Sequence, residues 1–333
     1  MEKNELILVT GVNGYIASHI ANEALAKGFR VRGTVRTPSS AAWLQQHFDK
    51  TYGEGRFSLV QIKSFDTDGA LDPFLEGVSA IAHTANTGLS PAPEPYITEA
   101  VNSVVKALDS ASRFSGIKRF VYTSSSLAAV SPTPDTEFEV SSEAYNEDSV
   151  KVAREPPFDE TNIWNVYAAS KVLAEQAAWK WVADNKPHFG FSTTLPNANF
   201  GPSLSKEHQG YPSTGGWPKM FFDGNFAGIS FVPPQYFVDV RDDAKIHIAA
   251  LSEPNVPNSR IFAFAAPYNW NDVLAILRRL YPQRKFAEDL PNVGRDLSRV
   301  PNQHAEELLK SFGQKGGWTS LEQSLKDTFE GLE

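Results

Sequence analysis

The sequence predicts an α/β protein with a doubly wound parallel sheet and a smaller C-terminal α+β lobe. Short apolar, β-branched runs alternate with longer helical patterns through the first 200 residues. Buried parallel strands read as continuous apolar runs, and each needs a crossover helix that returns the chain to the same edge of the sheet. The first of these runs ends in a glycine-containing turn that opens a helix. Together these observations favour a Rossmann-type sheet with right-handed crossovers.

Six apolar runs are expected to form the strands of this sheet, at residues 6–9, 31–35, 57–62, 78–82, 119–123 and 191–195. The helical patterns between them predict helices near residues 15–27, 40–51, 95–114 and 165–185. Between the fifth strand and the last of these helices, residues 135–160 carry nine acidic residues against two basic ones. We interpret this segment as a solvated loop that overhangs the strand ends, where such sheets bind ligands.

Beyond residue 200 the pattern loosens, because stretches rich in proline and glycine separate short pieces of strand and helix. Two helices are expected there, near residues 270–280 and 319–331, the second with Thr319 or Ser320 as its N-cap. We expect residues 1–200 and about 241–265 to form the larger domain. The smaller lobe, over the carboxyl edge of the sheet, would consist of residues from about 201 to 240 and from 266 to 333.

Composition excludes several classes of function. The 333 residues include no cysteine, so disulfides, thiolate metal sites and a cysteine nucleophile are excluded. The seven histidines lack ligand spacing, so no metal is expected. A formal charge of −8 without a basic run disfavours nucleic acid as a partner. No apolar run resembles a membrane span or a secretory signal, which makes a cytoplasmic protein the expectation.

The turn after the first strand, Thr10–Ala17, has the features of a dinucleotide-binding turn. Gly11 allows a tight turn, and Gly14 lets the backbone approach a pyrophosphate at the helix N-terminus. Ala17 is small enough for the helix to lie close to the strand. A Gly-x-x-Gly pair alone is weak evidence and could be a chance turn. Its place between the first strand and a helix predicts dinucleotide binding.

The end of the second strand selects the cofactor. NAD sites place an acidic residue there to accept from the ribose hydroxyl, whereas NADP sites place a cation there. This strand continues into Arg36 and has no acidic residue at its end. Arg36 can form a forked contact with a 2′-phosphate and stack on adenine. NADPH is the expected cofactor; the alternative is that Arg36 is a solvated strand-end charge.

Three polar groups are expected at the carboxyl edge of the sheet. Tyr167 and Lys171 are four residues apart in a helical stretch, so they share one helix face, where the ammonium would favour the phenolate. Ser124–Ser126 directly follow the fifth predicted strand. Each feature alone is common, as a helix pair or as turn chemistry. Their order and spacing behind a glycine turn are much more specific.

With these motifs the sequence resembles the extended short-chain dehydrogenases/reductases, and more narrowly the dihydroflavonol-reductase-like branch that includes yeast and fungal carbonyl reductases of the aldehyde reductase II type. The resemblance covers essentially the whole chain. It also rests on Gly33–Arg36, His83–Ala85, Leu195–Asn197, Ser213–Trp217 and Phe237–Asp242. It implies NADPH-dependent reduction of aldehydes, ketones or ketoesters, with a small carbonyl compound as substrate and a monomer or homodimer as the assembly.

The resemblance also implies roles for individual residues. Ser125 would orient the carbonyl, Tyr167 would be the general acid, and Lys171 would hold the nicotinamide ribose and lower the pKa of Tyr167. Because Ser126 directly follows Ser125, the resemblance leaves open which of these two serines supplies the catalytic hydroxyl. The residues expected at the cofactor are Thr10, Gly11, Asn13, Gly14, Tyr15, Ile16, Arg36, Asp66, Thr84, Ala85, Ser124, Tyr167, Lys171, Pro196, Asn197 and Ser213. The residues expected at the substrate are Thr87, Trp217 and Phe237, although aromatic residues in a small lobe are often core.

Two other functions stay open. A nucleotide-sugar epimerase or dehydratase of the same fold usually uses NAD and needs an extensive sugar-nucleotide site, and Arg36 argues against NAD. A non-catalytic NADP-sensing regulator is the second, since a fold does not fix a function. Such a sensor would have no need of Ser125, Tyr167 and Lys171 together.

Overall fold

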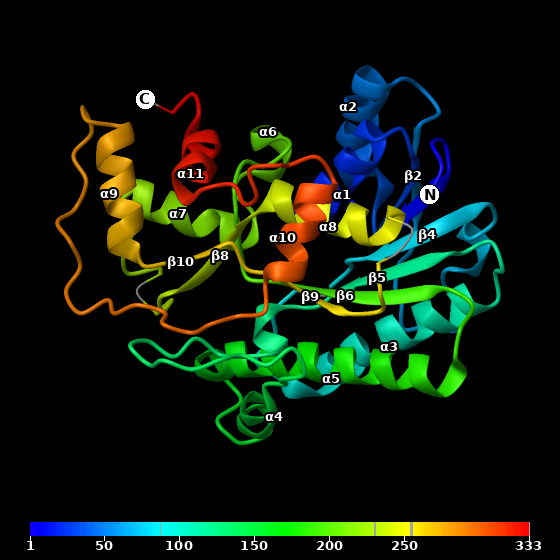
Figure 1. Cartoon of the computed structure of the whole chain (residues 1–333), viewed down its shortest axis with the longest axis horizontal. Helices are drawn as coiled ribbons and strands as arrows, with labels where there is room; N and C mark the ends of the chain where they lie inside the picture. The colour runs from blue at the N-terminus through cyan, green and yellow to red at the C-terminus, as the bar shows by residue number, and fades with distance from the viewer. Residues whose placement is uncertain (87, 230, 254–255, 333) are drawn as a thin grey trace.

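A seven-stranded parallel sheet forms the centre of the larger part of the molecule (Figure 1). The computed structural model describes residues 1–86, 88–229, 231–253 and 256–332. The strands lie in the order β3-β2-β1-β4-β5-β6-β9. They are β1 (Leu6–Val9), β2 (Arg30–Val35), β3 (Phe57–Gln61), β4 (Val78–His83), β5 (Arg119–Thr123), β6 (Gly190–Pro196) and β9 (Arg260–Ala263). This topology confirms the predicted doubly wound sheet, whose order reverses between β1 and β4.

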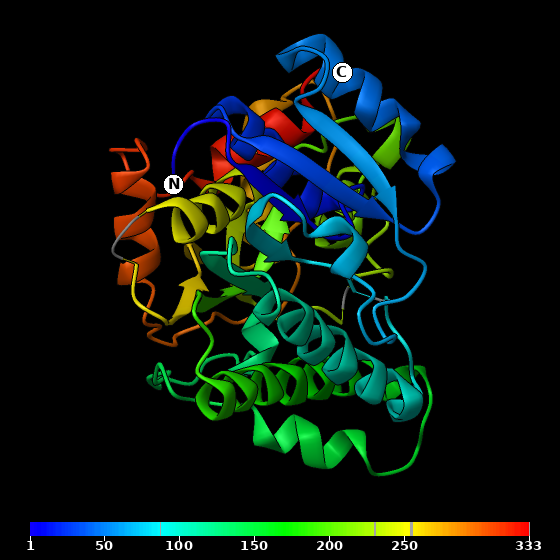
Figure 2. The same cartoon turned by 90° about the vertical axis from the view of Figure 1, so that its right-hand side faces the viewer.

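Helices cover both faces of this sheet (Figures 1 and 2). One face carries α1 (Tyr15–Ala26), α2 (Ala42–Tyr52), α8 (Val240–Ser252) and α10 (Gln303–Ser311). The other carries α3 (Pro93–Ser112) and α5 (Ile163–Asn185). In β1, Ile7 and Val9 pack toward the first set of helices, and Leu6 and Leu8 pack toward the second. Burial on both faces is why the strand reads as an unbroken apolar run.

A smaller lobe packs at the carboxyl edge of the sheet. Its three-stranded sheet has the order β10-β8-β7. The lobe's elements are β7 (Ala198–Phe200), α6 (Lys206–Gln209), α7 (Gly216–Phe222), β8 (Gln235–Asp239), β10 (Ala266–Tyr268), α9 (Trp270–Leu280) and α11 (Leu321–Phe329). Ser320 caps α11 by accepting a hydrogen bond from the Gln323 N–H, as predicted for this position. The proposed division of the chain into two domains stays a prediction.

The acidic segment 135–160 differs from the expected solvated loop. It contains α4 (Glu147–Ala153), which packs against α5 on the side away from the sheet (Figure 1). Val150 and Ala153 are three residues apart and buried, which gives this short helix an apolar face. Before α4 the segment pairs with the C-terminal part of the chain, where the Val140 N–H donates to the Arg299 carbonyl at 2.8 Å. The many acidic residues hid this pattern because they lie on the solvent side.

Candidate active site

A cavity of about 760 Å³ lies at the carboxyl ends of the strands, between the large sheet and the smaller lobe. Its volume is in the range of sites for small molecules and cofactors, about 300–1,000 Å³. Most of the predicted site residues line it: Gly11, Asn13, Gly14, Tyr15, Ile16, Arg36, Asp66, Thr84, Ala85, Ser124, Ser125, Tyr167, Lys171, Pro196, Asn197, Ser213 and Trp217. Segments far apart in the sequence therefore meet at one place.

Two of the described residues that were predicted for the site, Thr10 and Phe237, are not part of this lining. Thr10 is buried behind the wall, where its Oγ1 accepts hydrogen bonds from the N–H groups of Thr84 (2.9 Å) and Ala85 (3.0 Å). Phe237 packs in the core of the smaller lobe, against the rings of Phe200 and Tyr268. Its ring fills the space between the small sheet and its helices, so the core interpretation holds. Thr87 lies outside the described residues.

The glycine turn fits a dinucleotide pyrophosphate. Gly11 has a φ of +64°, and a Cβ added there would lie 3.2 Å from the Ala85 Cα. A side chain at this position would therefore be strained and would also push away the segment that follows β4. Gly14 directly precedes α1 and brings no side chain to its N-terminus, so the first N–H groups of the helix stay available to an anion.

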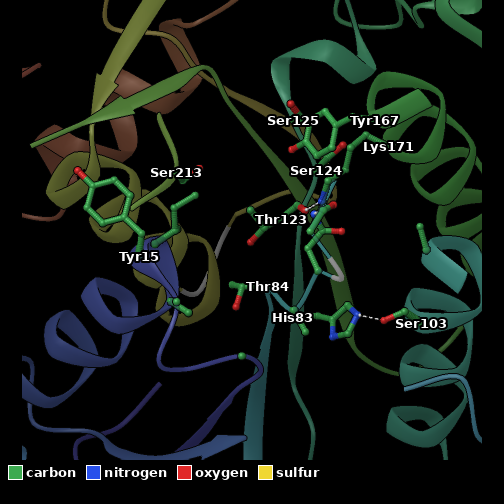
Figure 3. Close-up of a pocket in the computed structure, with 18 of the residues that line it drawn as sticks. Tyr15, His83, Thr84, Ser103, Thr123, Ser124, Ser125, Tyr167, Lys171 and Ser213 are labelled. Carbon is green, nitrogen blue, oxygen red and sulfur yellow. Dashed lines mark hydrogen bonds between the residues drawn. The ribbon is translucent and has the colours of Figure 1, made fainter. Parts of the chain in front are cut away.

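Tyr15 connects this turn to the smaller lobe. Its hydroxyl donates to the Gly201 carbonyl at 2.6 Å, and its ring lies 2.9 Å from where a Cβ on Gly215 would be. Burial raises the pKa of Tyr15 well above its ordinary value. Figure 3 shows Tyr15 and Ser213 across the cavity from Ser125 and Tyr167. We infer that the Tyr15 ring forms part of the cavity wall and that its hydroxyl group is already engaged in the hydrogen bond to Gly201.

Arg36 is exposed at the edge of the cavity, directly after β2. No ion pair to its guanidinium is present in the described parts of the chain. The nearby Asp66 is already partnered: its Oδ1 accepts from Asn102 at 2.7 Å and from Lys106 at 3.3 Å. These contacts, that from Asn102 above all, hold the pKa of Asp66 below its usual value. The guanidinium of Arg36 therefore lies at the cavity edge without an ion-pair partner among the described residues.

His83 is a buried neutral group under the cavity. Its Nε2 lies 3.1 Å from the Ser103 Oγ (Figure 3). Its Nδ1 lies 3.1 Å from the Thr10 Oγ1, and its ring stacks on Tyr122. Burial lowers the pKa of His83 to about 3. His19, which is buried in α1, has its pKa lowered to about 4 for the same reason.

We expect acid to destabilise the protein through these two histidines. Their folded-state pKa values lie below the unfolded value of about 6.5, so the unfolded chain binds more protons below that pH, and stability is lost as the pH falls toward 4 and then 3. Each histidine should contribute about 2 kcal/mol of this loss by pH 5. Chemical denaturation between pH 8 and pH 5 measures it.

Variants separate this effect from that of the carboxylates. His83→Gln should make the loss of unfolding free energy with falling pH less steep. The matched change at the exposed His188, to glutamine, should leave the steepness unchanged. If His83→Gln unfolds with the same pH dependence as the parent, then His83 is not a buried group that stays neutral in the folded protein.

The strand-end serines have different partners. The Ser124 Oγ donates to the Glu175 Oε2 at 2.7 Å, behind the cavity. Ser125 caps the short turn of Ser126–Ala128, its Oγ accepting from the Leu127 N–H at 3.2 Å, and it forms a hydrogen bond with Tyr167. Ser125 and Tyr167 lie side by side at the cavity wall (Figure 3). This arrangement favours Ser125 over Ser124 as the hydroxyl that meets a substrate.

The pKa values of Tyr167 and Lys171 differ from the expectation. Removal from bulk solvent raises the pKa of Tyr167 to about 12, although its hydrogen bond with Ser125 lowers it somewhat. Burial lowers the pKa of Lys171 to about 8. The Lys171 Nζ donates to the Thr123 carbonyl at 3.1 Å and lies 5.9 Å from the centroid of the Tyr167 ring. Desolvation therefore outweighs any stabilisation of the phenolate by Lys171, and the phenol is protonated at neutral pH.

An aromatic wall continues from Tyr167 toward the surface. Trp164 packs edge-on against Tyr167 with 6.1 Å between ring centroids, and edge-on against Trp217, also at 6.1 Å. Phe231, which is 56% exposed, stacks on the outer side of Trp164. Sequence reasoning missed Trp164, although its position three residues before Tyr167 places both side chains on one helix face.

A glycine turn at the switch point and a serine–tyrosine–lysine set across the cavity define a dinucleotide-binding oxidoreductase. The family model described as "NAD dependent epimerase/dehydratase family" matches residues 7–221. The chain belongs to this family, and its predicted membership of the extended short-chain dehydrogenases/reductases is confirmed.

Relatives match along nearly the full chain. Aldehyde reductase 2 of Sporidiobolus salmonicolor is 37% identical over 98% of this chain and 96% of its own length. The ketoreductase adrE of Penicillium rubens is 39% identical over 96% and 94%. The crystal structure of Gre2 from Candida albicans in complex with NADPH superposes with a TM-score of 0.82, at 26% identity, over 98% of this chain and 97% of that one.

Two kinds of feature are missing from the part of the chain that the structure describes. None of its helices combines the length and the apolar character needed to cross a bilayer. Nor does it hold three or more histidine or acidic side chains grouped so that they could bind a metal ion.

Proposed function

We propose that the protein is an NADPH-dependent carbonyl reductase that converts aldehydes, ketones or ketoesters to alcohols. The observation that carries the proposal is the pairing of Ser125 with a protonated Tyr167 at the wall of a dinucleotide-sized cavity. The reductase and ketoreductase names of the relatives, and the NADPH complex of Gre2, support it. A cytoplasmic location and a monomeric or homodimeric state stay predictions.

Bound NADPH would supply the hydride that reaches the carbonyl carbon. Tyr167 would donate its phenolic proton to the carbonyl oxygen as negative charge develops there. The Ser125 Oγ accepts from the Leu127 N–H, and its hydrogen would turn from the phenol of Tyr167 to donate to the same carbonyl oxygen when a substrate binds. The raised pKa of Tyr167 suits this direction of reaction, since the group starts out protonated.

The cofactor would span the cavity. The Gly11–Gly14 turn and the N-terminus of α1 would hold the pyrophosphate. Arg36 would bind the 2′-phosphate, and Lys171 would reach the nicotinamide ribose. Pro196 and Asn197, which follow one another at the end of β6, would pass beside the nicotinamide.

The test follows the absorbance of NADPH in the presence of aldehydes, ketones and ketoesters, with nucleotide sugars as a parallel series. Oxidation of NADPH with carbonyl compounds supports the proposal. Interconversion of nucleotide sugars without net NADPH consumption would favour the epimerase or dehydratase. Tight NADPH binding with no turnover of any substrate would favour the sensor.

Trp217→Ala is expected to change substrate ranking. Trp217 lines the cavity and contacts Trp164, so its loss removes apolar contact area from a bulky substrate beyond the carbonyl. We expect KM for bulky aryl ketones to rise about tenfold, with small aldehydes and NADPH affinity little changed. Steady-state kinetics with a size series of ketones measures this ranking. Equal losses for every substrate together with a lower Tm would mean that Trp217 is a core residue.

A further inference from the structure

Glu175 is a buried carboxylate directly behind the proposed catalytic residues. It lies on α5 one helical turn after Lys171 and has no exposed surface. Its Oε2 accepts from the Ser124 Oγ at 2.7 Å, and its Oε1 accepts from the Thr193 Oγ1 at 2.7 Å. The carboxylate thus contacts β6 and the residue that directly follows β5, at the point where the cavity begins, and these contacts fix its position.

Arg260 on β9 completes the set of partners. Its Nε donates to the Glu175 Oε1 at 2.8 Å, and its Nη2 donates to the Oε2 at 3.3 Å. Its Nη1 donates to the carbonyls of Ser142 and Ala144, in the acidic segment, at 2.8 and 2.7 Å. The guanidinium also lies over the ring of Tyr145. A second segment of the chain therefore holds Arg260, and Arg260 in turn holds the carboxylate of Glu175.

A buried ion pair of this kind is weak evidence for a stabilising role, because apolar side chains of similar volume often stabilise as much. The surroundings of Lys171 indicate another role. Its ammonium is faced by the ring of Tyr122 and the carbonyl of Thr123 on β5, and by the ring of Tyr167 on α5. His83 on β4 also interacts with its charge. None of these groups is an anion at neutral pH.

We propose that Glu175 is a positioning residue for the proposed reduction, placing a fixed negative charge behind Lys171 so that Lys171 stays an ammonium where the cofactor ribose binds. The inference rests on the proposed function. Burial lowers the pKa of Lys171 to about 8, and the charge of Glu175 opposes that shift. Glu175 itself also faces Arg260, Ser124, Thr193 and the ring nitrogen of Trp179.

The test compares Glu175→Gln with the parent over a pH series through neutrality to mildly alkaline values. Two quantities are measured on the full chain: the Kd of NADPH from fluorescence titration, and kcat/KM for an aldehyde that the parent reduces. Without the negative charge, Lys171 should lose its proton at lower pH. The alkaline midpoints of both profiles should therefore move down by about one pH unit. The Kd profile needs no turnover, so it tests Glu175 even if the parent reduces no carbonyl compound.

Two further variants serve as controls, one for the place of the lost charge and one for a failure to fold. Asp242→Asn also converts a fully buried carboxylate to an amide, but outside the cavity lining of the described residues, and it should leave the midpoints unchanged. If Glu175→Gln fails to fold because Arg260 is left unpaired, the double variant Glu175→Gln/Arg260→Gln removes both charges. It should give a smaller shift in the same direction.

A third variant keeps the negative charge at position 175. Glu175→Asp keeps the charge and should bring the midpoints back toward those of the parent. Glu175→Gln with a lower Tm but unchanged midpoints would overturn the proposal, because the carboxylate would then be only structural.

Discussion

Replacing Tyr167 with phenylalanine is expected to lower kcat by about 10²–10⁴-fold, the usual contribution of a general acid. The phenyl ring keeps the edge-on contact with Trp164 and the packing of the cavity wall, while the phenolic proton is lost. The Kd of NADPH, measured by fluorescence titration, should change little. A variant that turns over within a few-fold of the parent would show that the proton comes from another group.

Two serine variants locate the second hydroxyl. Ser125→Ala should also lower kcat severely, because the Ser125 Oγ is the serine hydroxyl bonded to Tyr167. Ser126→Ala, the matched change one residue further on, should lower kcat much less. The reverse order of effects would move the catalytic hydroxyl by one position.

Arg36→Ala is expected to remove most of the preference for NADPH over NADH. A charge-assisted, forked contact from guanidinium to phosphate contributes about 1.5–3 kcal/mol. That corresponds to about a ten- to a hundredfold preference in kcat/KM. The variant should lose activity with NADPH and keep it with NADH, since NADH has no 2′-phosphate. Steady-state kinetics with both cofactors gives the ratio.

Two controls sharpen this result. Arg30→Ala removes an exposed arginine at the other end of the same strand and should leave the cofactor ratio unchanged. In the parent, higher ionic strength should weaken the binding of NADPH more than the binding of NADH, because salt screens an exposed phosphate contact. Lys63 also lines the cavity. If Lys63→Ala changes the ratio and Arg36→Ala does not, then Lys63 is the residue that binds the phosphate.

Local sequence signals predicted the large sheet and one end of the site well. The fifth predicted strand matches β5 to the residue, and β1 matches as well, because strands buried on both faces leave unbroken apolar runs. The glycine turn and the Tyr167–Lys171 spacing are equally local, and the structure brings both to one cavity. Such features depend on few distant neighbours.

The features that sequence reasoning missed depend on packing between distant segments. The burial of Phe237 in the lobe core depends on its contacts with Phe200 and Tyr268. The pKa of Tyr167 depends on how deeply its side chain is buried in the cavity wall. Glu175 looks like an ordinary helix residue until Arg260, which is 85 positions further on, pairs with it. No local pattern carries that information.

The placement of β9 affects how the chain can fold during its synthesis on the ribosome. This edge strand of the large sheet, Arg260–Ala263, pairs with β6, and α8 and α10 cover the same face as α1. A nascent chain that has emerged only to residue 200 would therefore leave an open strand edge and an apolar face in contact with water. Such intermediates are prone to aggregate. We expect the sheet to become complete only late in translation, after β9 has emerged.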